Sequence, residues 1–511
     1  MDFLTKPNVG FILTGSSAQF SLPLVKQHLE KNEIFGRLEL FPIGGLRVDG
    51  VVTSVGVDSS WNYSIGQEIS GEFSQKLLAE WQEFSAHEDF ASVRFVALKL
   101  LNRNDLSGSL RMLEREVLFA SAVMRILQVL ADTNYSLLVF DVTPHQFLQY
   151  VTWKVAEWRG LAVLFFQPVG IAPLMIPRTS LEEALKFGFR SHLRADVLAR
   201  CEAIFDDELR GLTVGQDPPY MEKQKARDLT VGRNRQKWLS LRNLALWLFR
   251  DRYNSSIDFL GHGGGNAILR RLAAVAAGRS LQLSLRQTIA KQSVSTIASK
   301  KYALFALHYE PERTSLPEGL PIDFQADAVG VARSLLPGGV ELYVKEHYSQ
   351  QTSALRGFAG RSPRFYNLID AFADTYFLPI EQNLSEAING ASFVFTIAGS
   401  VAIEAAVRGV PVLYFGSPWW EGLPGSYKIS RKTKPGELAG FIPSTAQEVR
   451  GFLQSLLQEC TLPGVAGESR TNAARRYGDL SSSFYQTEAA SIALCIEEVI
   501  RSSANGRARR R

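Results

Sequence analysis

Three short segments in the second half of the chain carry polar side chains of the kinds that bind phosphates and transfer protons. Each segment directly follows an apolar run that is typical of a buried strand. The polar residues are His308, Glu310 and Glu312 in the first segment, Lys345 and His347 in the second, and Gly399, Ser400 and Glu404 in the third. Carboxyl ends of neighbouring parallel strands lie about 5 Å apart, so these side chains are expected to share one crevice.

The third segment, TIAGSVAIEAAVRG, has the pattern of a strand, a tight turn and a helix. The N–H groups at such a helix start favour a phosphate or a carboxylate, and Ser400 adds a hydroxyl donor. Glu404, one turn further along, is expected to hold a ribose hydroxyl or a neighbouring cation. The competing interpretation is structural, with Ser400 as an N-cap and Glu404 as a capping-box-like glutamate.

In the second segment, a lysine and an imidazole follow the apolar strand LYV. His347 can donate a hydrogen bond to a departing phosphate while Lys345 offsets its charge, which stabilises a leaving group without a metal ion. The alternative is a solvated strand end. His308, Glu310 and Glu312 pose a similar choice, since the carboxylates suit a general base or a sugar-hydroxyl ligand but also suit a charged loop.

The first half of the chain offers fewer candidates, all at predicted strand ends. His145 follows the strand LLVFDV and is a candidate base or acceptor-hydroxyl ligand, because imidazole titrates near neutral pH; a turn histidine beside Pro144 is the alternative. Gly15 and Ser16 follow NVGFIL and form either an acceptor-side loop or only a turn. The glycine-rich segment 261–266, GHGGGN, has no clear preceding strand and no Lys-Ser/Thr pair, which favours a surface loop over a phosphate-binding loop.

Strand-like and helix-like segments alternate twice along the chain, which predicts two parallel α/β units. We predict an α/β, GT-B-like fold with two Rossmann-type domains, a helical insertion and a C-terminal helical segment. The predicted limits are 1–290 for an acceptor-side domain with an insertion at about 180–252, 300–440 for a nucleotide-sugar-binding domain, and 441–511 for helices and a basic tail. The last helices are expected to pack outside or to cross back to the first domain.

Composition excludes several classes of protein. Of 511 residues, 46% are hydrophobic, and four of the five net positive charges come from the C-terminal segment GRARRR. The body is nearly neutral, which argues against a nucleic-acid-binding surface; the basic tail suits an anionic membrane surface or a disordered end. Three dispersed cysteines and no apolar run of spanning length indicate a cytoplasmic protein with no metal site.

The segments ALHYEPE, LYVKEH, TIAGSVAIEAAVRGVPVLYFG and TPHQFLQYVTWKVAEWRGLAVLFFQP resemble the capsule polysaccharide biosynthesis family, whose better-understood members are Kdo transferases that use CMP-Kdo. The similarity extends from about Tyr135 to Gly416. It implies a GT-B enzyme in the cytoplasm at the inner membrane, a nucleotide-sugar donor, and a growing or lipid-linked glycan as acceptor. It also implies that His347 and Ser400 bind the nucleotide phosphate.

Two positions depart from the family pattern. Tyr348 stands where the family has proline, so the backbone after His347 is expected to be looser, because only proline fixes φ there. Glu310 stands where the family has glutamine and adds negative charge near an anionic donor. The leading hypothesis is metal-independent, cofactor-free transfer of a sugar from its nucleotide, with Kdo from CMP-Kdo as the donor that the resemblance implies. The alternatives are polyol-phosphate transfer, epimerisation of a UDP-sugar, and a non-catalytic glycan-binding or export-associated subunit.

Overall fold

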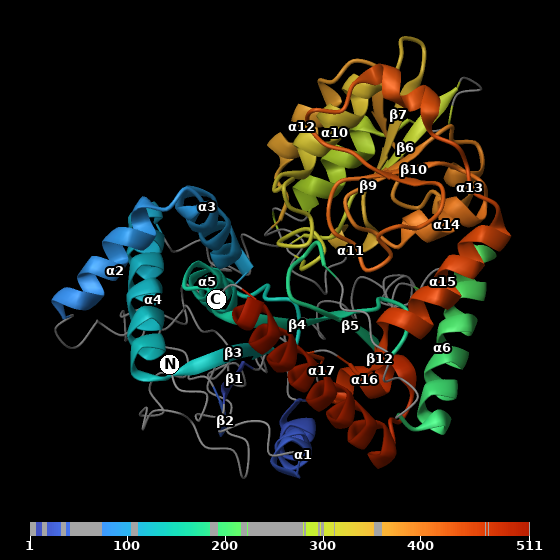
Figure 1. Ribbon diagram of the computed structural model, residues 1–511. Helices are drawn as coiled ribbons and strands as arrows, with labels where there is room; N and C mark the ends of the chain where they lie inside the picture. Colours follow the sequence, from blue (N-terminus) through green and yellow to red (C-terminus); the bar gives the residue numbers. More distant parts are fainter. Residues whose placement is uncertain are drawn as a thin grey trace, which may run out of the picture.

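A computed structural model gives the fold of the chain. It describes residues 7–12, 18–31, 37–40, 74–103, 111–183, 193–215, 222, 280, 283–294, 297, 301–310, 312–351, 360–465, 467–468 and 470–509. These residues form two α/β domains, seen one above the other in Figure 1, each built on a six-stranded sheet.

The sheet of the first domain has the strand order β12-β5-β4-β3-β1-β2. Its strands are β1 (Asn8–Ile12), β2 (Arg37–Leu40), β3 (Tyr135–Phe140), β4 (Ala162–Pro168), β5 (Leu174–Arg178) and β12 (Leu462–Pro463). Strands β2, β1, β3 and β4 are parallel, whereas β5 and β12 add on as antiparallel strands. The parallel strands place the ends of β1, β3 and β4 at one edge.

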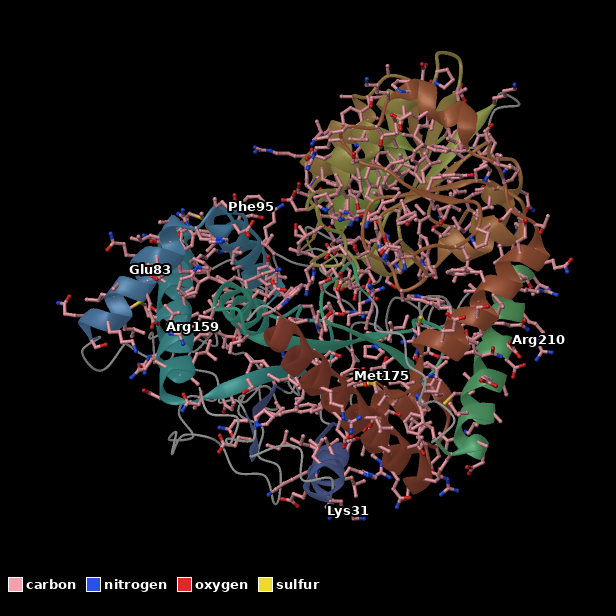
Figure 2. The ribbon with its side chains drawn as sticks, viewed as in Figure 1. Lys31, Glu83, Phe95, Arg159, Met175 and Arg210 are labelled. Carbon is pink, nitrogen blue, oxygen red and sulfur yellow. The ribbon has the colours of Figure 1, made fainter. Side chains whose placement is uncertain are left out.

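Side chains alternate between the two faces of this sheet, and both faces are covered by helices. Leu138 and Phe140 pack under α2 (Gln75–Ala86), α3 (Phe90–Leu100), η2 (Leu101–Arg103), α4 (Met112–Asp132) and α5 (Phe147–Trp158). Leu137 and Val139 pack on the other face, against α1 (Ala18–Lys31) and α17 (Ser482–Arg509). Met175 of β5, labelled in Figure 2, belongs to this second core.

The second domain has a fully parallel sheet in the order β11-β10-β9-β6-β7-β8. Its strands are β6 (Tyr302–Ala306), β7 (Glu341–Lys345), β8 (Thr375–Phe377), β9 (Val394–Thr396), β10 (Val412–Tyr414) and β11 (Ser426–Lys428). The central strands β6, β7 and β9 are buried throughout and largely apolar, with Glu341 and Lys345 at the two ends of β7, as expected for a parallel sheet with helices on both faces.

Two sets of helices cover the second sheet. One face packs against α10 (Gln325–Leu335), α12 (Pro363–Asp370) and η6 (Pro435–Gly440). The other packs against α6 (Ala195–Thr213), α13 (Leu384–Asn389), α14 (Val401–Val407) and α15 (Ala446–Cys460). Helix α6, at the right of Figure 1, falls within the predicted helical insertion and contacts α14 of the second domain and α17 and β12 of the C-terminal segment.

The C-terminal segment crosses back to the first domain. After α15, strand β12 pairs with β5, and α16 (Arg470–Tyr477) and α17 follow. Helix α17 packs against α1 and β4 (Figure 1), so one of the two predicted positions for these helices is correct. The predicted GT-B-like fold with two Rossmann-type domains is confirmed. Within the described residues, no helix is both long and apolar enough to span a bilayer.

Candidate functional site

The three predicted strand-end segments meet at the carboxyl edge of the second sheet. Strand β6 pairs with β7 on one side and with β9 on the other, so the residues that follow these strands are neighbours. The backbone N–H of Leu307 donates to the carbonyl of Lys345 at 2.9 Å, which continues the pairing of β6 and β7 to the edge. The expected proximity of the segments therefore follows from the strand order.

His308 is buried and uses its ring to fix the turn after β9. Its Nε2 accepts the N–H of Ala398 at 3.1 Å and lies 3.1 Å from Oγ1 of Thr396. Burial lowers the pKa of His308 to about 3, with His347 and Arg361 adding to the effect, so the ring is neutral. A Cβ on Gly399 would lie 3.2 Å from this ring and 2.9 Å from Oγ1 of Thr396, which explains the glycine. We infer that His308 shapes the turn.

Ser400 and Glu404 do not form the cap suggested by the structural interpretation. Ser400 is the N-cap residue of α14, but its side chain makes no capping hydrogen bond. The carboxylate of Glu404 instead accepts the hydroxyl of Ser385 and lies 3.3 Å from a guanidinium nitrogen of Arg408. Glu404 is thus held between α13 and the end of α14, whereas the partly exposed Ser400 keeps its hydroxyl at the sheet edge.

His347 is held in one tautomer. The N–H of Ser349 donates to Nδ1 of His347 at 3.2 Å, so in the neutral ring the hydrogen is on Nε2. Burial lowers the pKa of His347; the carboxylates of Glu312 and Glu346 oppose this shift. The short helix α11 (Tyr348–Gln351) begins directly afterwards, and the N–H of Gln350 donates to the carbonyl of His347 at 2.9 Å. Hydrogen bonds therefore order the backbone where the family has proline.

Lys345 and Glu310 contact protein groups of the second domain. The ammonium of Lys345 donates to the carbonyls of Pro379 at 2.6 Å and Ile380 at 2.5 Å, in the segment after β8. Glu310 accepts a hydrogen bond from Arg361 at 2.9 Å. The negative charge that Glu310 adds to the family pattern is therefore balanced by an arginine within the same domain.

Arg361 is a residue of the site that sequence reasoning missed. Its fully buried guanidinium donates to Glu346 through Nε at 2.9 Å, to Glu310 through Nη1 at 2.9 Å, and to the carbonyl of His308 through Nη2 at 2.8 Å. Burial alone would lower the pKa of Arg361, but the carboxylates of Glu346 and Glu310 outweigh burial and raise it. Tyr366 also donates to Glu346 at 2.9 Å.

His145 lies where the two domains meet. Its Nδ1 lies 2.9 Å from the carbonyl of Thr143, which can only accept, so the neutral ring has its lone pair on Nε2. Burial, followed by the charge of Arg103, lowers the pKa of His145 to about 3. The guanidinium of Arg103 donates to the carbonyl of His145 and, at 2.5 Å, to the carbonyl of Glu312. One side chain thus joins the acceptor-side candidate to the segment after β6.

Further polar contacts join the domains around this point. Glu318 of the second domain accepts the hydroxyl of Thr143 at 2.8 Å and the guanidinium of Arg313 at 2.9 Å. Lys99 of α3 pairs with Asp323 at 2.5 Å.

Glu312, the last predicted residue of the segment after β6, is exposed. Its carboxylate accepts the hydroxyl of Thr314, in the same domain, at 3.0 Å.

The predicted acceptor-side residues Gly15 and Ser16 lie outside the described residues, and so does the segment 261–266, for which a surface loop is the favoured prediction. Among the residues that the structure does describe, no group of three or more His, Cys, Asp or Glu side chains is arranged to hold a metal ion.

Comparisons with known proteins give only distant similarities. No family model matches the sequence, and no curated protein matches it. Among solved structures, a β-Kdo 2,7 transferase, KpsC of Thermosulfurimonas dismutans, is 11% identical, with 67% of this chain and 87% of that chain covered and a TM-score of 0.27. A β-Kdo 2,4 transferase, also KpsC of Thermosulfurimonas dismutans, is 12% identical, with 63% of this chain and 88% of that chain covered and a TM-score of 0.26. A UDP-N-acetylglucosamine 2-epimerase of Neisseria meningitidis bound to UDP-GlcNAc is 10% identical, with 97% of this chain and 100% of that chain covered and a TM-score of 0.21. These values assign no activity to the chain, and the family membership stays a prediction.

Proposed function

We propose that this protein is a glycosyltransferase that moves a sugar from a nucleotide donor to a hydroxyl group of a glycan acceptor without a metal ion. The observation that carries the proposal is the double contact of Arg103, which donates to the carbonyls of His145 and Glu312. A histidine with its lone pair on Nε2 is thereby held next to the sheet edge that carries His347 and Ser400. A base and a phosphate-binding edge at one junction suit group transfer between two bound substrates.

On the donor side, His347 and Ser400 would bind the phosphate that leaves. The Nε2–H of His347 makes no hydrogen bond to a described residue, and the hydroxyl of Ser400 does not cap its helix. Both are donors, and donors aimed at a phosphate stabilise the charge that develops as the bond from the anomeric carbon to the phosphate oxygen breaks. Lys345 and Glu404 would stabilise the segments that carry these donors, because both side chains bind groups of the protein itself.

On the acceptor side, His145 would take the proton of the attacking hydroxyl. The acceptor oxygen forms the new bond to the anomeric carbon, and its proton passes to Nε2 of His145. A pKa of about 3 keeps the ring neutral and able to accept at pH 7. An anionic donor beside the ring would raise that pKa, because a nearby negative charge favours the imidazolium form.

The nature of the sugar and of the polymer is a finer proposal that rests on the sequence resemblance. We propose capsule or surface polysaccharide as the product and Kdo, from CMP-Kdo, as the first donor to test. The acceptor would be a growing or lipid-linked glycan. The enzyme would work in the cytoplasm, with the basic C-terminal tail contacting the inner membrane surface.

Nucleotide binding tests the proposal directly. Thermal unfolding of the full chain is measured with CMP, CDP, UDP and GDP, since a ligand at 100 times its dissociation constant adds about 2.7 kcal/mol of stability. We expect one nucleotide to raise the Tm and His347→Ala to abolish the rise, while His87→Ala, at the exposed end of α2, retains it. Stabilisation by CMP supports the Kdo donor. A preference for CDP favours polyol-phosphate transfer, and a preference for UDP favours a UDP-sugar. If none of the four nucleotides stabilises the protein, the enzymatic proposal is wrong.

A further inference from the structure

Arg361 contacts both the segment after β6 and the segment after β7, although the sequence did not predict it as part of the site. It lies just before α12, and its side chain is fully buried between the segments that follow β6 and β7. Its partners are the carbonyl of His308, the carboxylate of Glu310 and the carboxylate of Glu346. A planar guanidinium has donors in a fixed fork, so such contacts hold three groups in one relative orientation.

One arm of this network leads from Arg361 to His347. Glu346 accepts the Nε–H of Arg361 and the hydroxyl of Tyr366 through Oε2, both at 2.9 Å, and the N–H of His347 through Oε1 at 2.8 Å. The carboxylate of Glu346 therefore fixes the backbone at His347. The N–H of Ser349 donates to the ring, and this hydrogen bond depends on the backbone position that Glu346 sets.

A second arm leads from Arg361 to the turn after β9. Nη2 of Arg361 donates to the carbonyl of His308 at 2.8 Å, and the amide of Gln325 donates to the same carbonyl at 3.2 Å. The ring of His308 accepts the N–H of Ala398 at 3.1 Å, immediately before Gly399. A change in the position of His308 would thus move the turn that presents Ser400.

Gln350 closes the network between β6 and β7. Its side chain accepts the N–H of Glu310 at 2.8 Å and donates to the carbonyl of Glu310 at 3.0 Å. Glu310 is therefore fixed through its backbone by Gln350 and through its carboxylate by Arg361. Both residues lie close to the two positions that depart from the family pattern, and both supply order there.

We infer that Arg361 is a positioning residue for the phosphate of the nucleotide: through Glu346 and His308 it sets the distance between the His347 donor and the Ser400 turn. This inference rests on the proposed function. Arg361 acts through these residues and is too deeply buried to touch the donor itself. It also assigns a role to Glu310, whose carboxylate orients and neutralises Arg361.

The test compares Arg361→Lys with Arg333→Lys. Lysine keeps the positive charge but loses the fork. Arg333 is a matched control because its guanidinium also binds carbonyls of the second domain, those of Val340, Leu336 and Pro337, but at the opposite edge of the sheet. Calorimetric titration with CMP, CDP, UDP and GDP should show at least tenfold weaker binding in Arg361→Lys for the nucleotide that the wild type binds best, a change of 1.4 kcal/mol. Arg333→Lys should stay within twofold.

A second measurement separates positioning from mere stability. Nitrogen-15 NMR of the imidazoles should show His347 as the Nε2–H tautomer in the wild type and in Arg333→Lys, and as a mixture of tautomers in Arg361→Lys. If Arg361→Lys fails to fold, Tyr366→Phe removes the hydrogen bond from Tyr366 to Glu346 and should give a smaller change in the same direction.

The two proposals fail in different ways. If the wild type binds none of the four nucleotides, the proposed function is wrong, and the tautomer of His347 still tests whether Arg361 positions that residue. If the wild type binds a nucleotide and a folded Arg361→Lys binds it equally well with an unchanged tautomer, the positioning role is overturned while the proposed function stands.

Discussion

The carboxyl edges of the two sheets hold their candidate residues in different ways. At the edge of the second sheet, His308 and His347 are fixed by groups of their own domain, including Thr396, Ser349 and Arg361. At the edge of the first sheet, His145 is fixed through Arg103, which also binds the second domain. The contacts that fix His308 and His347 are therefore made within one domain, whereas the position of the acceptor-side histidine depends on how the domains meet.

The largest expected effect would break the donor edge alone. Arg361→Met leaves the fully buried carboxylate of Glu346 without its charged partner. Removing one member of a buried ion pair costs about 3–5 kcal/mol. We expect a loss of this size in guanidinium unfolding of the full chain. Arg94→Met, which breaks an ion pair with Glu116 at the more exposed surface of the first domain, should cost about 1 kcal/mol or less. Equal losses in the two variants would mean that the network around Arg361 contributes no more than a surface pair.

The second prediction separates the acceptor edge from the donor edge. Arg103→Met removes the hydrogen bonds to the carbonyls of His145, Glu312 and Leu316. His145 should therefore be displaced, while the contacts that fix His308 and His347 within the second domain remain. A displacement of about 1 Å can lower the rate about 10²-fold. Steady-state kinetics with the nucleotide-sugar identified by the binding panel should show a fall of this order in kcat and little change in the KM for the donor.

Arg159→Met is the control for that experiment, because Arg159 pairs with Glu80 at the end of α5, away from the junction (Figure 2). It should leave kcat within twofold. A raised donor KM with an unchanged kcat in Arg103→Met would place Arg103 at the donor edge and remove the distinction between the two edges.

The sequence predicts this architecture better than it predicts the contacts within the site. The apolar run LLVF in β3 of the first sheet and the glycine turn at Gly399 after β9 of the second sheet are local signals, and such signals were enough to predict the strands and where each one ends. Arg361 binds partners 15 and 51 residues away along the chain, and no local pattern shows which arginine will do so. The Ser-Pro start of α12 is visible in the sequence, but it marks only the helix that follows. The roles assigned to Lys345 and Glu404 stay predictions, because their side chains contact carbonyls, a hydroxyl and an arginine of the same domain.

The smallest expected effect concerns the two histidines with strongly lowered pKa values, one at each edge. Both pKa values are about 3 in the folded protein, against about 6.5 in the unfolded chain. Between pH 6.5 and 3 the unfolded state therefore binds more protons, so stability falls as the pH falls, by about 1.4 kcal/mol per pH unit for each histidine. We measure the free energy of unfolding by guanidinium between pH 4.5 and 6. His308→Gln and His145→Gln should each make its decrease with falling pH smaller by about 1.4 kcal/mol per pH unit.

Arg103 distinguishes the two histidines in this experiment, because its charge helps to lower the pKa of His145 and is not among the causes for His308. Arg103→Met should therefore raise the pKa of His145, followed by proton NMR of its ring, and leave that of His308 unchanged. If both pKa values rise together, the charge of Arg103 also lowers the pKa of His308, and the two edges do not differ in their dependence on Arg103. If neither changes, the charge of Arg103 does not contribute to the pKa of His145, and Arg103 acts on that residue only through its hydrogen bond.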